Sequence, residues 1–253
     1  MIIQIIGLPG AGKTVLAKAL KERINAVHFN ADEVRAGLNN DLGFTNDDRV
    51  EQARRMGELA RLVSKQGFPV IVDFVCPTEQ TRRAFGFADI VIWVDRIKQG
   101  RYEDTNKVWE DPQYCDIRID DQWTVEEEVE LIIKACSLFD WSAPTTLQLG
   151  RYQPWHEGHQ ALKAEAHNRT EQVLVGVRNT YGTSEKDPMP YKQVEDLILN
   201  ENPIGNGDTL VLRLPNITNI VYGRDVGYKI EQVDLGATIH AISATEKRKQ
   251  LGI

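Results

Sequence analysis

The octapeptide GLPGAGKT at residues 7–14 has the residue types and the spacing of a loop that cradles a polyphosphate. It follows the apolar run 2–6 and precedes a helical pattern, so the expected order is strand, glycine loop and helix. Glycines let backbone N–H groups turn toward phosphates, Lys13 would place an ammonium on the β- and γ-phosphates, and Thr14 would offer a hydroxyl to Mg²⁺. A glycine-rich turn that binds nothing is the alternative. The predicted nucleotide-binding residues are Gly7, Gly10, Gly12, Lys13 and Thr14.

Two acids follow or interrupt predicted strands near the edge at which parallel sheets bind ligands. Asp32 comes just after a short strand at 26–29 and could accept the proton of an attacking hydroxyl, although a helix N-cap explains it equally well. Asp73 interrupts the apolar run 69–75 where an acid that organises Mg²⁺ would lie. A buried structural carboxylate bonded to the phosphate-loop amides is its alternative. The predicted magnesium residues are therefore Thr14 and Asp73.

A second set of chemically capable residues lies in the sequence GRYQPWHEGH at 150–159. His156 and His159 open a helix expected over 157–168 and project to one face of it. Imidazoles beside free helix amides make an anion site, suited to a triphosphate attacked at its α-phosphorus. Zinc binding and an inert pair of surface histidines are the alternatives. The other histidines stand in no recognisable ligand pattern: His28, His167 and His240.

The composition is that of a soluble globular protein, with 42% apolar and 26% charged residues among 253. A net charge of -7 argues against a general nucleic-acid binder but not against nucleotides as small-molecule partners. The three cysteines lack CxxC spacing, so a disulfide framework is not expected. The expected location is the reducing cytoplasm. The run 2–6 is too short for a signal peptide, and no segment is long enough for a membrane span.

Strands and helices alternate to about residue 138, which predicts a doubly wound α/β domain. The polar, charged segment 96–110 has the composition of a lid, and 139–144 reads as a short linker. The second half repeats the α/β alternation around different motifs, so the expected class is α/β in two domains, 1–140 and 145–253. The expected strands are 2–6, 26–29, 69–75, 90–94, 117–119, 145–149, 173–177 and 210–214. The expected helices are 12–23, 47–66, 125–136, 157–168 and 191–199.

Three blocks of the first half resemble adenylylsulfate kinase: the loop 7–14, DEVRAGLNNDLGF at 32–44 and DRVEQARR at 48–55. That family shows a GLxGxGK[ST] loop, a DNVRxGLNxDLGF segment and a DRxENIRR helix. The resemblance covers about residues 1–138 and implies a P-loop kinase sheet, with ATP as substrate and Asp32 assisting a 3′-hydroxyl. The implied residues for binding adenylylsulfate are Arg35, Phe44, Arg49, Gln52 and Val75.

The same half departs from the family pattern at several positions. Gln52 stands where the family has Asn, and Val75 begins a Val-Cys-Pro where the family has Ile-Ser-Pro. Asp73 stands where the family usually has a small residue, and the lid with its Lys-x-Phe-Thr-Gly element is shortened. The resemblance therefore supports a kinase more strongly than it supports adenylylsulfate as the acceptor.

Two motifs of the second half resemble the nucleotidyltransferase superfamily, most closely nicotinamide mononucleotide adenylyltransferases and cytidylyltransferases. GRYQPWHEGH at 150–159 is similar to GRFQPFHxGH, and ISATEKR at 242–248 matches ISxTxxR. The resemblance implies a small Rossmann-like domain in which the helix start and Arg248 bind the β- and γ-phosphates. VYGRDVG at 221–227 is faintly similar to a segment of ATP sulfurylase, although a turn explains it as well. The implied nucleotide-binding residues are Gly150, Arg151, His156, His159, Ser243, Thr245 and Arg248.

Together these motifs predict a bifunctional transferase. One half would phosphorylate the 3′-hydroxyl of an adenylylsulfate-like nucleotide, with Lys13 and Asp32 in catalysis. The other would transfer AMP or CMP to a phosphate or another oxyanion and release pyrophosphate, with His156, His159 and Arg248 in catalysis. If sulfate is the acceptor, nucleotidyl transfer would produce the substrate of the kinase and so couple the two reactions. The motif at 150–159 favours nicotinamide mononucleotide or a cytidylyl acceptor instead. The alternative from another functional class is a regulatory protein that senses nucleotides and has degraded catalysis. A second protomer in a homo-oligomer would cap the short second domain.

Overall fold

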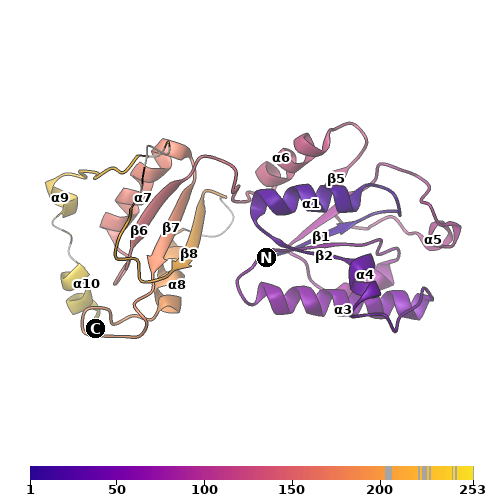
Figure 1. The fold of residues 1–253 in the computed structure, drawn as a ribbon, viewed down its shortest axis with the longest axis horizontal. Coiled ribbons are helices and arrows are strands. Elements are labelled where there is room, and N and C mark those ends of the chain that lie inside the picture. Colours follow the sequence, from indigo (N-terminus) through magenta and orange to yellow (C-terminus); the bar gives the residue numbers. More distant parts are fainter. Residues whose placement is uncertain are drawn as a thin grey trace. The chain divides into compact units, whose positions relative to one another are not determined.

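The structure is a computed structural model, described over residues 1–202, 207–221, 223, 227, 229–240, 242 and 244–252. The chain divides into two compact units, Met1–Cys136 and Ser137–Ile253, just before the predicted linker (Figure 1). Both units contain a parallel sheet with helices packed on it, so the predicted α/β class is confirmed.

The first unit is built on five parallel strands in the order β2-β3-β1-β4-β5. Helices α1 and α6 pack together over one face of this sheet, and α3 and α4 over the other (Figure 1). The strands are β1 Ile2–Ile6, β2 Val27–Asn30, β3 Val70–Asp73, β4 Ile90–Val94 and β5 Ile117–Ile119. The helices are α1 Lys13–Ile24, α2 Ala31–Ala36, α3 Asn46–Ser64, α4 Glu79–Phe85, α5 Glu103–Val108 and α6 Val125–Ala135.

The interior strands of this sheet are continuous apolar runs because helices cover both faces. Ile3, Ile5 and Ile6 of β1 are fully buried. Strand β3 lies in the interior of the sheet, and β5 lies at one edge of it. On one face Gly57 of α3 lies directly against the backbone of Phe85, where any Cβ would clash with the carbonyl oxygen. A glycine inside this helix therefore lets α3 and α4 approach closely.

The second unit contains three parallel strands in the order β6-β7-β8. Its strands are β6 Thr146–Gly150, β7 Val173–Arg178 and β8 Thr209–Leu214. Its helices are α7 Glu157–Thr170, α8 Tyr191–Glu201, α9 Ala237–His240 and α10 Ala244–Leu251. Helix α7 packs on β6 and β7, and α8 packs on β8. The core lies around β7, whose Val173 and Val175 are fully buried, and Val194 and Ile198 of α8 join it.

Five helices of the described residues are not among those expected from the sequence: α2, α4, α5, α9 and α10. They are short, and α5 lies inside the segment predicted as a lid. Cys76, Cys115 and Cys136 are free thiols. Within the described ranges, no helix combines the length and the apolar character needed to cross a bilayer.

Candidate functional sites

The predicted phosphate loop joins β1 to α1, and its glycines take conformations that side chains disfavour. Gly10 and Gly12 both have a φ of 94°, and Gly12 is the N-cap of α1. At Gly7, with a φ of 153°, a Cβ would clash with the carbonyl oxygen of Val94 in β4. Because only glycine fits these positions without strain, the loop can hold its amides around an anion at the start of α1.

Lys13 is the first residue of α1 and points back into the phosphate loop. Its Nζ donates to the carbonyl oxygen of Leu8 at 3.0 Å, and the side chain is buried. Burial lowers the pKa of Lys13 to about 8, although the negative charges of Asp73 and Asp32 act to raise it. A bound polyphosphate would favour the charged ammonium and offset this desolvation.

Asp73 ends β3 and is the centre of a buried hydrogen-bonded cluster beneath the loop. Its Oδ2 accepts from Thr14 Oγ1 at 2.6 Å, and its Oδ1 lies 2.5 Å from His28 Nε2. Asn30 Nδ2 donates to both carboxylate oxygens at 3.1 and 3.2 Å. Burial by itself raises the pKa of Asp73, but the hydrogen bonds from His28 and Thr14 offset it and leave the pKa below its ordinary value. Asp73 therefore stays charged and orients the hydroxyl of Thr14.

Thr14 and Asp73 suit a magnesium site in which Thr14 contacts the ion and Asp73 does not. Both oxygens of Asp73 are already engaged by protein groups, so it would act on the ion through Thr14 and water. Across the described residues, no three or more His, Cys, Asp or Glu side chains gather to hold a metal. Mg²⁺ keeps several waters and takes its remaining ligands from substrate phosphates, so an indirect arrangement of this kind suits it.

We expect Asp73→Asn to raise the Mg²⁺ concentration that gives half-maximal kinase activity, because the hydroxyl of Thr14 loses its charged acceptor. A magnesium titration of initial rates measures this. Asp95→Asn is the matched control, since Asp95 directly follows strand β4 but pairs with Arg118 and Lys98 instead of the phosphate loop. An unchanged magnesium dependence together with a lower melting temperature would establish the purely structural role instead.

Asp32 lies in the first turn of α2 with a carboxylate available for chemistry. The alternative that Asp32 is the N-cap is wrong, because Asn30 occupies that position and its Oδ1 accepts from the amides of Asp32 and Glu33 at 3.0 and 3.1 Å. Asp32 is exposed, and its charge acts on both Lys13 and Arg35. An exposed carboxylate whose charge acts on the phosphate-loop lysine can accept a proton from a substrate hydroxyl.

Arg35, Phe44 and Arg49, three of the residues implied to bind adenylylsulfate, lie together. The guanidinium of Arg35 lies 4.7 Å from the centre of the exposed Phe44 ring. Arg49 Nε donates to the carbonyl oxygen of Phe44 at 3.0 Å, and its Nη2 pairs with Asp104 of α5 at 2.5 Å. Arg49 also lines a pocket of about 370 Å³ that includes Trp109. An aromatic ring with two arginines suits a flat, anionic ligand.

Gln52 and Val75 hold different positions from those three. Gln52 is buried, its Oε1 accepts from Asn39 at 2.8 Å, and its Nε2 donates to the carbonyl oxygen of Ala31 at 3.1 Å. Its amide is therefore occupied in supporting the start of α2. Val75 is half-buried in the turn after β3. Their contact with a substrate stays a prediction.

Two arginines at the phosphate loop are not predicted from the sequence. Arg96 Nη1 donates to the carbonyl oxygen of Ala11 at 3.1 Å, and the same guanidinium pairs with the buried Glu128. The side chain of Arg101 lies over Gly10. Its backbone amide donates to the carbonyl oxygen of Pro9 at 3.2 Å, and no described residue bonds its guanidinium. The segment predicted as a lid thus brings a free cation to the loop.

The two histidines of the second unit stack on one another at the start of α7. Their ring centres are 3.8 Å apart, and His156 Nδ1 caps the helix by accepting from the amide of Gly158 at 3.1 Å. His159 Nδ1 is buried with no hydrogen-bond partner in the described part of the chain. Burial lowers the pKa of both, that of His159 to about 4. Both imidazoles are therefore neutral near pH 7 and can donate to an anion.

Arg248 of α10 reaches the loop that precedes these histidines. Its Nη1 donates to the carbonyl oxygen of Gln153 at 2.7 Å, and its Nη2 to Thr245 Oγ1 at 3.2 Å. Lys247 also pairs with Glu157 at 2.8 Å, so both signature motifs meet in space. Ser243 and residues 224–226 lie outside the described residues.

The other two predicted nucleotide-binding residues lie at the end of β6. Gly150 is the last residue of that strand, where a Cβ would crowd the Tyr152 ring. Arg151 is exposed and pairs with Asp187 at 3.1 Å. Arg151 would have to leave that carboxylate to reach a phosphate, so its nucleotide contact stays a prediction.

The depressed pKa of His159 predicts a pH-dependent stability for the second unit. An unfolded histidine titrates near 6.5, so between that value and about 4 the unfolded chain binds the extra proton. The contribution of His159 is complete above pH 6.5 and is lost as the pH falls toward 4. Urea unfolding of the wild type and His159→Gln from pH 4 to 7 measures it. Equal pH slopes for the two proteins would contradict the assignment.

Taken with the fold, these residues form one unit with a glycine-rich loop between a parallel strand and a helix, and a second α/β unit in which Arg248 contacts the loop before two stacked histidines. Residues 1–87 match the family model for adenylylsulphate kinase. An adenylyl-sulfate kinase of Paraburkholderia xenovorans is 44% identical over 88 residues, 33% of this chain and 49% of that protein. The bifunctional enzyme NodQ of Azospirillum brasilense is 39% identical over 88 residues, 33% of this chain and 14% of that protein.

A solved structure of similar fold is the Mycobacterium tuberculosis APS kinase CysC, in complex with AMPPNP and APS. It has a TM-score of 0.49 and 21% identity, and the match covers 53% of this chain and 95% of that one. The chain spans about half the length, or less, of the curated relatives it matches. The family match ends at residue 87 and does not reach the second unit.

Proposed function

We propose that the chain is a bifunctional transferase, with a kinase domain over residues 1–140 and a nucleotidyltransferase domain over 145–253. The kinase transfers the γ-phosphoryl group of ATP to the 3′-hydroxyl of an adenylylsulfate-like nucleotide. The nucleotidyltransferase joins the nucleoside monophosphate of a triphosphate to an oxyanion acceptor and releases pyrophosphate.

The observation that supports the kinase most strongly is the exposed carboxylate of Asp32, whose charge acts on Lys13, within the region that matches adenylylsulphate kinase. Asp32 accepts the proton of the attacking hydroxyl while the phosphate-loop amides and Lys13 hold the transferred group. Mg²⁺, held by Thr14 with Asp73 behind it, would neutralise phosphate charge. Arg35, Arg49 and Phe44 hold the acceptor nucleotide by charge and stacking.

The nucleotidyltransferase is supported by the meeting of Arg248 with the loop that carries His156 and His159. The buried, unpartnered Nδ1 of His159 is a polar atom that a bound ligand would satisfy. The neutral imidazoles and Arg248 would hold the β- and γ-phosphates, whose charge grows as pyrophosphate leaves.

Product analysis of the full chain tests the two activities separately. With ATP and Mg²⁺ we expect ADP release that depends on added adenylylsulfate, and pyrophosphate release from ATP or CTP that depends on a second acceptor. Nucleotide binding without either product would establish a sensor instead. Light scattering of the same sample tests the predicted homo-oligomer.

A further inference from the structure

The segment that precedes α5 lies directly against the phosphate loop. The backbone amide of Arg101 donates to the carbonyl oxygen of Pro9 at 3.2 Å. A Cβ at Gly100 would come within 2.7 Å of the Pro9 Cδ, so the two segments approach this closely because residue 100 has no side chain. The contact brings the side chain of Arg101 over Gly10, where its Nε lies 3.1 Å from the position that a Cβ of Gly10 would take.

Asn106 of α5 holds this segment with both polar groups of its side chain. Its Oδ1 accepts from the backbone amide of Gly100 at 2.8 Å, and its Nδ2 donates to the carbonyl oxygen of Gly100 at 3.1 Å. A side chain that bonds the backbone N–H and C=O of the same residue fixes the local path of the chain. Asn106 therefore sets the direction in which the next side chain, that of Arg101, leaves the backbone.

Helix α5 is itself tied to α3, so Asn106 stands on a fixed element. Arg49 of α3 pairs with Asp104 at 2.5 Å, and its Nη1 donates to Thr105 Oγ1 at 3.2 Å. Thr105 is buried. The two residues just before Asn106 are therefore held by Arg49, a residue proposed to bind the acceptor nucleotide.

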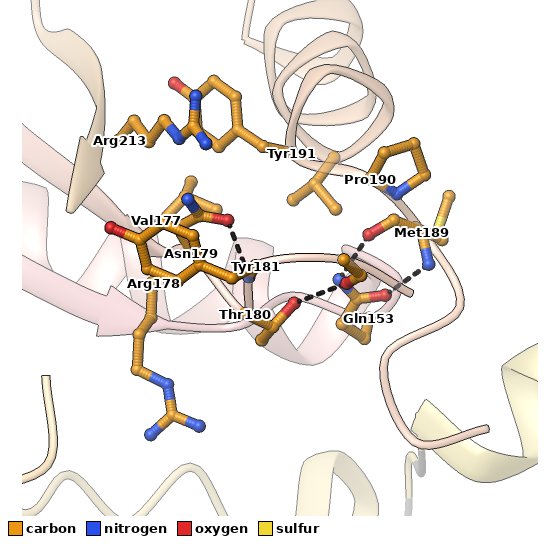
Figure 2. Close-up of a pocket in the computed structure, with 12 residues that line it drawn as sticks. Gln153, Val177, Arg178, Asn179, Thr180, Tyr181, Met189, Pro190, Tyr191 and Arg213 are labelled. Carbon is orange, nitrogen blue, oxygen red and sulfur yellow. Dashed lines mark hydrogen bonds between the residues drawn. The ribbon is translucent and has the colours of Figure 1, made fainter. Parts of the chain in front are cut away.

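The guanidinium of Arg101 is available to an anion. The side chain is exposed, and none of the residues that the structure describes gives its guanidinium a hydrogen bond or an ion pair. Arg213 of the second unit, by comparison, lies 5.3 Å from the centre of the Tyr191 ring, in a pocket of about 340 Å³ where β7 ends (Figure 2). Arg101 has neither a ring nor an acid and is placed through the backbone of its own segment. Its donors are thus left for a phosphate bound by the loop.

We propose that Asn106 is a positioning residue of the kinase, which holds Gly100 against the phosphate loop and so keeps the guanidinium of Arg101 on the γ-phosphate of ATP. The inference rests on the proposed kinase function of this unit. In the transfer, the oxygen of the acceptor hydroxyl forms a bond to the γ-phosphorus, and its proton passes to Asp32. The bond from the γ-phosphorus to the bridging oxygen breaks, and ADP leaves with that electron pair. Arg101 stabilises the charge spread over the transferred group.

Calorimetric titration of the full chain with AMPPNP and with ADP, both with magnesium, tests the contact. All proteins carry Arg248→Ala, so that the proposed triphosphate site of the second unit does not contribute. We expect Arg101→Ala and Asn106→Ala each to weaken AMPPNP binding by about tenfold or more, as for a lost hydrogen bond to a charged group. Binding of ADP should stay unchanged, because ADP has no γ-phosphate. A loop that had merely lost its shape would weaken both nucleotides alike.

Two variants of the same segment are the matched controls. Lys98→Ala removes an exposed cation that pairs with Asp95, and Glu103→Ala removes an acid of α5 that pairs with Lys107. Neither contacts the phosphate loop in the described structure. Both should keep the wild-type affinity for AMPPNP and the wild-type turnover.

The rate of ADP release with adenylylsulfate gives a second readout. Arg101→Ala should lower the turnover by about a hundredfold or more, as for a lost donor to a developing charge. Asn106→Ala should lower it by about tenfold to a hundredfold, the effect of a misplaced group. The double variant should be no slower than Arg101→Ala alone, because Asn106 acts through Arg101.

Unchanged AMPPNP affinity in either single variant would overturn the inference, as would equal losses for AMPPNP and ADP or rate losses that multiply in the double variant. The failure of the kinase itself would look different. AMPPNP binding that depends on Arg101 and Asn106, without ADP release from any acceptor, would refute the kinase and keep the contact. Wild-type rates of ADP release in both single variants would keep the kinase and refute the role of these two residues.

Discussion

Lys13→Ala should lower the kinase turnover by about a hundredfold or more, because the transition state loses a charge placed on the transferred phosphoryl group. The side chain of Lys13 is buried within the loop, and its Nζ donates to the carbonyl oxygen of Leu8. Initial rates of ADP release with saturating acceptor measure the loss. Pyrophosphate release should continue, because its site lies in the other unit.

Lys18→Ala is the matched control, since Lys18 lies on the same helix with its side chain exposed. The control should keep the wild-type turnover. Circular dichroism of both variants excludes unfolding as the cause of a lost rate. Wild-type ADP release by Lys13→Ala would refute the assignment of the phosphate loop as the kinase site.

His159→Ala and Arg248→Ala should each lower pyrophosphate release by about a hundredfold to a thousandfold, the typical effect of removing one donor to a developing charge. In the proposed site both side chains act on the same triphosphate. The loss in the double variant should therefore be smaller than the product of the single losses, because residues that act as a unit are not additive. ADP release by the kinase should remain.

His167→Ala and Lys249→Ala are the controls, because they remove an imidazole from the end of α7 and a cation from α10. Neither should change pyrophosphate release by more than a few-fold, since neither belongs to the two motifs. Elemental analysis addresses the zinc alternative directly. One tightly bound zinc per chain, lost in His159→Ala, would overturn the anion-site assignment.

The phosphate loop and the strands around it could be predicted because their signals are local. The apolar runs of β1 and β3 and the octapeptide between β1 and α1 are each readable within one short segment. The histidines at the start of α7 are predictable for the same reason. Asn30 and Asp32 could not be separated from sequence, because both are good N-cap residues two positions apart and only the geometry of α2 selects Asn30.

Contacts between distant segments could not be predicted. Arg101 reaches Gly10 because β4 lies beside β1, and no sequence pattern near either residue predicts that contact. His28 and Asp73 meet because β2 and β3 pair in register, which brings Asn30 opposite Asp73. The pocket at Arg213 likewise needs the ends of β7 and β8 and the start of α8 together. Such sites depend on tertiary packing and not on local spacing.

Transfer of a labelled γ-phosphate from ATP to adenylylsulfate tests the central claim most directly, with the products separated and identified by mass spectrometry. The proposed kinase predicts a product heavier by one phosphate, with the label on the 3′-hydroxyl and an equal amount of ADP, and neither product in Lys13→Ala. Unchanged adenylylsulfate, with the label recovered as inorganic phosphate or still on ATP, would contradict it.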